Sequence, residues 1–458
     1  MADTYLDLVN TPLPGRIAKA LGLPRPSVLR RYTPREVLAA RPVLVAGAGA
    51  GADAVADVLL GWDVEVRRHV LPGEKLSAAV VVLDAVASPT DLAAPMLEVG
   101  QAVKQLVPGG RVVGLFRSAA DTTNPAQAAA RQGIDGAIRS VAHELRGGAT
   151  ANGIVLRGDA TTTDATTLGA LRFFLSGRSA YVDGQFIEVS AASAESVVGI
   201  AAAMTAEGEG VPDQPLGGRT AVVTGAARGI GAKIAEVLAR DGARVVAVDV
   251  PAAGEQLAAV ANRIGGTTLQ LDITAPDAAT RILEHSGQRF GVLDIIVHNA
   301  GITRDKLLAN MDAARWDSVI AVNIVSQLRM NEEFLASSVF SGTGRIISLA
   351  STSGIAGNRG QSNYAASKAG VIGMVRAQAA AFDEAGRTIN AVAPGFIETD
   401  MTAKIPPLTR QVARRLSSLQ QGGLPVDVAE TVAFLASDAA AGINGQVVRV
   451  CGQNLVGA

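Results

Sequence analysis

The feature that most limits how this chain can fold is a series of strand and helix signals that occurs twice in the same order. The first series begins PVLVAGAGAGADAVADVLLGWDVEVRR and the second begins TAVVTGAARGIGAKIAEVLARDGARVVAVDV; each has an apolar strand, a glycine turn, a helix and a second strand. Later segments also correspond, AAVVVLDAV with LDIIVHNAG and GGRVVGLFRSA with TGRIISLAS. We interpret this self-similarity as an internal duplication with divergence.

Each half is expected to form a parallel sheet, because strands alternate with helical patterns of about ten to fifteen residues. The expected fold class is α/β, with two doubly wound Rossmann-like domains. The N-terminal domain is degenerate, flavodoxin-like or pseudo-Rossmann, and the C-terminal domain is complete. The expected boundaries are an extension at 1–36, a degenerate domain at 37–206, a linker at 207–215 and a complete domain at 216–458.

Two of these segments are assigned on composition alone. The linker lies in EGEGVPDQPLGG, whose Gly, Pro and acidic residues lack periodicity. The extension is rich in Pro and basic residues, which fits either a solvated segment packed over a domain surface or an arm that docks a partner.

Composition excludes several other classes of protein. Hydrophobic residues make up 48% and charged residues 18% of the chain, the net charge is -1, and no apolar run approaches the length of about 18 residues that spans a bilayer. Neither a nucleic-acid partner nor a membrane partner is implied. Cys451 is the single cysteine, so we expect no disulfide within the chain and no metal site. Asp3 and Asp7 stand where a secretory signal has basic residues, and we expect a cytoplasmic protein.

The glycine turn of the second half, TGAARGIG, is typical of a dinucleotide site. Gly225, Gly229 and Gly231 follow an apolar strand and precede an Ala-rich helix, so a pyrophosphate can approach the helix N-terminus closely. Asp249 ends the next strand, where a carboxylate can accept hydrogen bonds from ribose hydroxyls and repel a 2′-phosphate. This favours NADH over NADPH, although Arg228 in the turn could pair with that phosphate.

Further cofactor contacts are expected at the ends of the next two strands, where ligands bind in this type of sheet. They are Asp272, Ile273, Asn299, Ala300 and Gly301. His298 beside them is expected to be structural.

Acid–base chemistry is indicated by Tyr364 and Lys368, which are four residues apart and so share one face of a helix. An adjacent ammonium favours the phenolate and would lower the pKa of the tyrosine. Ser351 lies upstream in SLASTSG, directly after a strand, where its hydroxyl could bind a substrate carbonyl oxygen. Ser353 is a weaker candidate for that role.

Together these motifs resemble the short-chain dehydrogenase/reductase family over about 216–458. The resemblance rests on TGAARGIG, HNAG, Asn323, Ser351, YAASK and PGFIETDMT in that order. Within the family, NYAASKAGVIG and PGFIETDMT most resemble 3-oxoacyl-acyl-carrier-protein reductases. The whole chain, with its additional Rossmann-like domain, resembles the high-molecular-weight reductases of this kind in actinobacteria, including mycobacteria.

The resemblance implies a role for each matching residue. Tyr364 would protonate the 3-oxo oxygen and Ser351 would orient it. Lys368 would lower the tyrosine pKa and bind the nicotinamide ribose, and Asn323 would hold a water in the proton relay. The hydride would come from NADH, and the family's usual assembly implies a dimer or tetramer. The cofactor residues implied in addition to those above are Ile230, Tyr364, Lys368, Pro394, Gly395, Ile397 and Thr399.

The polar segment from Thr399 to Gly423 interrupts the alternation of strands and helices, as a substrate lid does. Its Arg410, Arg414 and Arg415 could contact a CoA or phosphopantetheine phosphate, or an acidic carrier protein. The alternative is a solvated helix face.

The first half lacks the groups needed for this chemistry. Its turn retains Gly47, Gly49 and Gly51 without the spacing found in the second half, and Gln127 stands at the position of Tyr364. Arg117 or Ser118 falls at the position of Ser351, and nothing aligns with Asn323. We expect a non-catalytic, structural role, with nucleotide binding without chemistry as the alternative.

Three functions remain open on the sequence. The first is NADH-dependent reduction of 3-oxoacyl thioesters, on CoA or carrier protein, in fatty acid metabolism. The second is the oxidation of 3-hydroxyacyl-CoA by NAD at the same residues. The third is a non-catalytic NAD-binding regulator or scaffold.

Overall fold

The computed structural model of this protein describes residues 4–21, 23–191, 214–384, 386–403 and 405–454. These residues form two compact units. The first consists of the described residues up to 191, Ile405–Gly423 and residues 451–454; the second consists of residues 214–403 and Leu424–Val450. Most of the predicted linker, 207–213, lies outside the described residues, so the domain boundaries stay a prediction. The two short C-terminal segments that belong to the first unit were not expected there.

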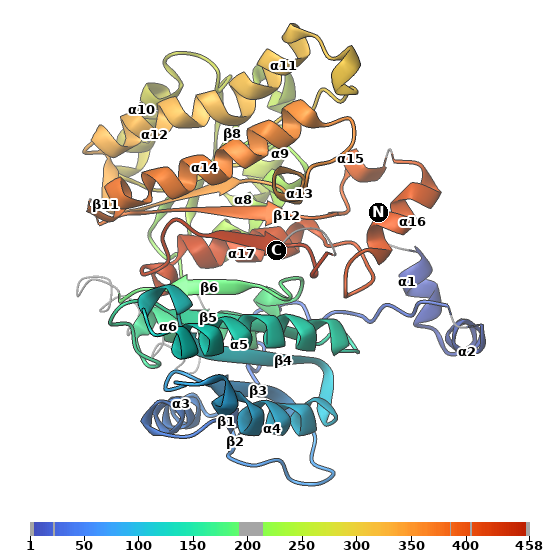
Figure 1. The fold of residues 1–458 in the computed structure, drawn as a ribbon. Coiled ribbons are helices and arrows are strands. Elements are labelled where there is room, and N and C mark those ends of the chain that lie inside the picture. The colour runs from blue at the N-terminus through green and yellow to red at the C-terminus, as the bar shows by residue number, and fades with distance from the viewer. Residues whose placement is uncertain (1–3, 22, 192–213, 385, 404, 455–458) are drawn as a thin grey trace. The chain divides into compact units, whose positions relative to one another are not determined.

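The first unit contains a parallel sheet of six strands in the order β2-β1-β3-β4-β5-β6 (Figure 1). The strands are β1 (Val43–Ala46), β2 (Val66–Arg67), β3 (Leu76–Val82), β4 (Leu106–Arg117), β5 (Thr150–Leu156) and β6 (Phe186–Val189). The helices are α1 (Thr4–Val9), α2 (Pro12–Ala20), α3 (Ala50–Gly61), α4 (Ala93–Val103), α5 (Pro125–Glu144), α6 (Ala165–Leu175) and α16 (Pro407–Arg415). The chain reverses direction across the sheet at β1 and β3, which is the flavodoxin-like order.

The second unit contains a parallel sheet of seven strands in the order β13-β12-β11-β10-β7-β8-β9. The strands are β7 (Thr220–Thr224), β8 (Arg244–Asp249), β9 (Thr267–Gln270), β10 (Leu293–His298), β11 (Phe340–Leu349), β12 (Thr388–Pro394) and β13 (Val447–Val450). The order reverses between β7 and β10, as in the Rossmann arrangement. The predicted fold class, two doubly wound α/β domains, is confirmed.

The helices of the second unit are α8 (Gly229–Arg240), α9 (Gly254–Ile264), α10 (Ala278–Phe290), α11 (Ala313–Ile320), α12 (Ser326–Ala336), α13 (Thr352–Ala356), α14 (Ser362–Glu384), α15 (Asp400–Ala403) and α17 (Pro425–Ala436). Helix α8 packs against α9 and α17. Helices α10, α12 and α14 instead share one buried cluster with the sheet.

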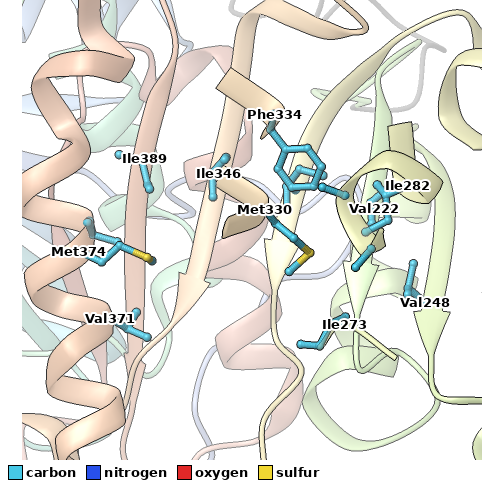
Figure 2. Packing of buried hydrophobic residues seen from close by; sticks show 14 of the residues in the cluster. Val222, Val248, Ile273, Ile282, Met330, Phe334, Ile346, Val371, Met374 and Ile389 are labelled. Carbon is cyan, nitrogen blue, oxygen red and sulfur yellow. The ribbon is translucent and has the colours of Figure 1, made fainter. Parts of the chain in front are cut away.

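That cluster is the hydrophobic core on one face of the second sheet (Figure 2). Strands β7, β10 and β12 are buried along their whole length and contain Val and Ile, because helices cover the sheet. The members labelled in Figure 2 include Val222, Ile346 and Ile389 from the sheet and Ile282, Met330, Phe334, Val371 and Met374 from the helices. The core fixes where the strands end, and so fixes the loops that carry the site.

None of the described helices is both long enough and apolar enough to cross a membrane. The residues described also contain no group of three or more His, Cys, Asp or Glu side chains suited to a metal ion.

Candidate active site

A cavity of about 750 Å³ is lined by residues at the carboxyl ends of the second unit's strands, around the reversal between β7 and β10. Loops diverge at such a reversal, which makes it the usual ligand site of an open parallel sheet. All the predicted site residues except Asn323 line this cavity. They are Gly225, Arg228, Gly229, Ile230, Gly231, Asp249, Asp272, Ile273, Asn299, Ala300, Gly301, Ser351, Tyr364, Lys368, Pro394, Gly395, Ile397 and Thr399.

The glycine turn joins β7 to α8 and is held by the loop after β10. Gly225 has φ +68°, a conformation that favours glycine. Asn299 Nδ2 donates to the main-chain oxygens of Thr224 and Gly225, each at 3.0 Å. Asn299, predicted to contact the cofactor, therefore uses its amide donors to shape the turn.

Gly231 lies in the first turn of α8, where the helix passes closest to that loop. A Cβ atom added at Gly231 would lie 2.1 Å from the oxygen of Gly225 and 2.4 Å from Asn299 Nδ2. No side chain fits there, so the helix N-terminus is fixed beside the cavity. A helix N-terminus carries partial positive charge and exposed N–H groups, which suit a pyrophosphate.

Asp249, at the end of β8, lies beside the same turn. Its Oδ2 accepts a hydrogen bond from the main-chain N–H of Ala227 at 3.0 Å, and its Oδ1 accepts one from Val250 at 2.9 Å. Arg228 is exposed and also lines the cavity. The helix N-terminus, the strand-end carboxylate and the nearby Lys368 form a donor and acceptor set that fits a nicotinamide dinucleotide.

Ser351, Tyr364 and Lys368 come together in the wall of this cavity. Ser351 follows β11, accepts a hydrogen bond from the N–H of Ser353 at 3.1 Å, and forms a side-chain hydrogen bond with Tyr364. Lys368 lies one helical turn after Tyr364 on α14, with its Nζ 5.7 Å from the centre of the tyrosine ring. That Nζ donates to the main-chain oxygen of Leu349 at 2.6 Å. A hydroxyl pair and a buried ammonium therefore share one site.

The protonation of this group is set mainly by burial. Burial lowers the pKa of Lys368 to about 8, because a charged ammonium is costly away from water. Burial also raises the pKa of the Tyr364 phenol; the hydrogen bond with Ser351 opposes this, and the nearby Asp305 carboxylate adds to it. The structure therefore differs from the expected lowering of the Tyr364 pKa, because burial, the largest influence, raises it. Tyr364 stays a protonated phenol at neutral pH.

Asn323 lies behind the cavity wall, in a π-helical turn between α11 and α12. Its Oδ1 accepts from the N–H of Ile302 at 2.9 Å, and its Nδ2 donates to Ile302 O and Ser367 Oγ, both at 3.0 Å. A Cβ atom added at Gly301 would lie 3.2 Å from Asn323 Oδ1 and 3.5 Å from Lys368 Nζ. Asn323 and Lys368 therefore meet around Gly301, although Asn323 does not itself line the cavity.

His298 and Asp272 both form hydrogen bonds with neighbouring residues of the same unit. Burial lowers the pKa of His298 to about 4, and its Nε2 lies 2.9 Å from Oδ1 of Asn331. The imidazole is neutral at physiological pH, which fits a structural role. Asp272 Oδ1 accepts from the N–H and the hydroxyl of Thr274, so this exposed carboxylate closes a local turn.

The lining of the cavity also contains polar residues that the sequence did not single out. Arg304 and Gln361 both line it, and Gln361 Nε2 donates to Asp305 Oδ2 at 2.8 Å. The N–H of Lys306 also donates to the oxygen of Gly360 at 2.8 Å. The loops after β10 and before α14 are thus joined. In the sequence, only the position of these loops after the ends of strands indicated that their residues could line a ligand site.

The predicted lid divides between the two compact units. Thr399 and residues 400–402 line the cavity, whereas Ile405–Gly423 belongs to the first unit. Arg414 is 4% exposed, and Arg415 lies over the ring of Tyr5, 4.8 Å from its centre. The burial of Arg414 removes it from the predicted phosphate contacts, because a buried guanidinium does not face solvent.

In the first unit, the corresponding glycine turn contacts side chains of the protein itself. A Cβ atom at Gly51 would lie 2.5 Å from Asp84 Oδ2, and Arg68 donates to the oxygens of Gly47 and Ala52, each at 3.0 Å. A carboxylate and a guanidinium therefore occupy the surroundings of the α3 N-terminus. Gln127 accepts from Thr122 Oγ1 at 2.6 Å, a local contact without acid–base capacity.

Comparison with known proteins gives the same assignment for the second half. The family model described as Enoyl-(Acyl carrier protein) reductase matches residues 225–452. The chain is 41% identical over 237 residues to the 3-oxoacyl-(acyl-carrier-protein) reductase FabG of Vibrio cholerae, covering 52% of this chain and 97% of that protein.

Two further relatives carry the same description. The FabG of Escherichia coli strain K12 is 42% identical over 238 residues, covering 51% of this chain and 96% of that protein. The FabG of Thermotoga maritima is 40% identical over 244 residues, covering 52% of this chain and 98% of that protein. With the site geometry above, these matches show that the chain belongs to the short-chain dehydrogenase/reductase family.

Proposed function

We propose that the second unit reduces 3-oxoacyl thioesters, carried on CoA or on a carrier protein, to 3-hydroxyacyl thioesters, with NADH as the reductant. The observation that carries this proposal is that Ser351, Tyr364 and Lys368 line the same cavity as Asp249 and the glycine turn. Relatives of which the chain covers nearly the whole length are named as 3-oxoacyl-(acyl-carrier-protein) reductases, which supports the same reaction.

Each residue has a distinct task in this mechanism. The hydroxyls of Ser351 and Tyr364 orient the 3-oxo oxygen, and Tyr364 gives it a proton as negative charge develops there. The glycine turn and Asp249 would hold the reduced nicotinamide dinucleotide, which would supply the hydride for the third carbon of the substrate. Lys368 stabilises the resulting phenolate through its charge. Asn323 Oδ1 accepts one hydrogen bond, from the N–H of Ile302, and has a second lone pair. With that lone pair it would accept a hydrogen bond from the water that returns a proton to the site.

The protonation state of Tyr364 suits the reductive step. Burial raises the pKa of Tyr364, so the phenol is protonated at neutral pH and ready to donate. Oxidation of a 3-hydroxyacyl thioester would need the phenolate as a base. The protonated phenol is the form that the reductive step uses, while the net direction of turnover follows the ratios of the two cofactor forms and of the two thioesters.

The proposal is tested by mixing the purified full-length protein with acetoacetyl-CoA and NADH and following absorbance at the nicotinamide wavelength. We expect NADH consumption that depends on the thioester. Binding of NADH without turnover, over a panel of acyl lengths and with carrier-protein thioesters included, would instead support the non-catalytic regulator.

The choice of cofactor depends on the charge of Asp249. We expect Asp249→Asn to lower the discrimination against NADPH by roughly tenfold or more, because the repulsion of a 2′-phosphate is lost. The asparagine can still accept the hydrogen bond from Ala227, so the turn is kept. The measurement is kcat/KM for each cofactor with one thioester.

Arg228→Ala is the matched variant for this test. It removes the exposed cation of the same turn, and a loss confined to NADPH would show that Arg228 pairs with that phosphate. An unchanged NADH to NADPH ratio in Asp249→Asn would overturn the assignment of cofactor preference to this carboxylate.

The pH dependence of the reaction follows from Lys368. Its pKa is lowered to about 8, so the charged form is lost as the pH rises through this value, earlier than for an ordinary lysine. We expect kcat/KM for reduction to be level near neutrality and to fall above about pH 8, because the neutral amine no longer stabilises the phenolate. A pH–rate profile checks this, and a level profile up to pH 10 would contradict the role given to the ammonium.

A further inference from the structure

Two segments from the C-terminal half of the chain belong to the first compact unit. They are Ile405–Gly423, which follows the cavity wall at residues 399–402, and residues 451–454, which follow β13. The alternation of strands and helices gives no reason for either segment to leave its own domain. Their contacts therefore bear on what the first unit does.

Tyr181 of the first unit binds both segments. Its hydroxyl donates to the main-chain oxygen of Gln421 at 2.6 Å, and its main-chain oxygen accepts from the N–H of Gly452 at 3.0 Å. Gly452 has φ +58°, and a Cβ atom there would lie 2.8 Å from the tyrosine ring. Tyr181 is 1% exposed, so this is a buried, close-packed contact.

Other first-unit residues hold the same stretch on either side. Gln421 Nε2 donates to the main-chain oxygen of Ser27 at 2.7 Å. Ser418 Oγ lies 2.7 Å from Nδ1 of His143 and donates to Oε1 of Gln453 at 2.9 Å. Gln453 Nε2 in turn donates to the main-chain oxygen of Arg139 at 2.8 Å. The end of Ile405–Gly423 is thus fixed by hydrogen bonds to the N-terminal segment at Ser27, to the loop before β6 at Tyr181 and to α5 at His143.

We propose that the first unit holds Ile405–Gly423 in the conformation that admits the acyl thioester, and that Tyr181 is the positioning residue for this segment. Only residues 403 and 404 separate this segment from the cavity wall at 399–402, so anchoring the segment restrains the chain that leads out of the wall. A segment that is ordered before the substrate binds does not lose conformational entropy on binding, so the substrate binds more tightly. The inference rests on the proposed function for the identity of the substrate. It gives the first unit a role that does not require that unit to bind a nucleotide.

Tyr181→Phe tests the proposal, because it removes the hydroxyl that binds Gln421 and keeps the ring that packs on Gly452. We expect the KM for acetoacetyl-CoA to rise roughly three- to tenfold, the effect of one buried hydrogen bond, with kcat and the KM for NADH within about twofold of wild type. Gln421→Ala, which removes the bond to Ser27, should change the same constant in the same direction.

Thr167→Val is the matched control. Thr167 is a fully buried first-unit residue whose hydroxyl donates to the oxygen of Thr161 at 2.8 Å, far from the segment in sequence. Loss of the Thr167 hydroxyl removes a hydrogen bond similar to that of Tyr181. It should nevertheless leave kcat, the KM for acetoacetyl-CoA and the KM for NADH unchanged. Equal effects of Tyr181→Phe and Thr167→Val would overturn the proposal, since they would show only general destabilisation.

Limited trypsin digestion gives a readout that does not depend on activity. Arg410 and Arg415 are cleavage sites within the segment. We expect the full-length Tyr181→Phe protein to be cut there faster than wild type and Thr167→Val, because local opening becomes less costly. Unchanged cleavage would refute the anchoring role even if the protein reduced no thioester, and faster cleavage without thioester reduction would refute the proposed function alone.

Discussion

Tyr364→Phe should lower kcat for acetoacetyl-CoA reduction by on the order of 10²–10⁴-fold, the range for loss of a general acid. The phenol is the group that the structure places beside Ser351 in the cavity wall, and its raised pKa keeps the proton that it donates. Phenylalanine preserves the ring and the packing of α14. Steady-state kinetics with NADH and a single thioester measures the effect.

The same variant should still bind NADH, because the glycine turn and Asp249 are untouched. Tyr32→Phe is the control, since the ring under the Arg178 guanidinium remains and the residue belongs to the first unit. We expect that control to retain the wild-type rate. A Tyr364→Phe enzyme with more than a tenth of the wild-type kcat would show that another group donates the proton.

Gly231→Ala should abolish cofactor binding. The new methyl group would lie 2.1 Å from the oxygen of Gly225 and 2.4 Å from Asn299 Nδ2, distances that require the turn and the helix to separate. Overpacking of this kind costs about 1–3 kcal/mol or more. It would displace the N-terminus of α8, so the NADH dissociation constant, measured by fluorescence titration, should rise at least about a hundredfold.

Gly373→Ala provides the comparison for this result. It makes the same chemical change within α14, where a Cβ atom would meet no atom within 4 Å. Alanine is the better helix former, so this variant should be slightly more stable and bind NADH as wild type does. Wild-type NADH affinity in Gly231→Ala would mean that the cofactor does not use this turn.

Much of the second unit could be predicted because its signals are local. Glycine spacing in TGAARGIG identified the turn, since Gly225 and Gly231 satisfy backbone constraints within a few residues. The four-residue spacing of Tyr364 and Lys368 placed both on one helix, as the structure has them. The state of the tyrosine could not be predicted, because burial depends on the whole cavity wall.

The position of the segment after the cavity wall lay beyond local reasoning. Tyr181 and Gln421 are 240 residues apart, and no periodic pattern indicates that they meet. The hydrogen bond from Gln361, which lines the cavity, to Asp305 likewise depends on two loops being joined. Contacts between segments that are distant in the sequence determine both the position of this segment and the pairing of Gln361 with Asp305. Sequence patterns indicate only the structure of residues that are close together in the chain.

We propose that this site transfers a hydride to the third carbon of an acyl thioester while Tyr364 supplies the proton. The most direct measurement uses NADH deuterated at the transferable position with acetoacetyl-CoA, followed by mass spectrometry of the product. The account predicts 3-hydroxybutyryl-CoA with one deuterium at that carbon. Cofactor bound by the protein with acetoacetyl-CoA recovered unchanged would contradict it.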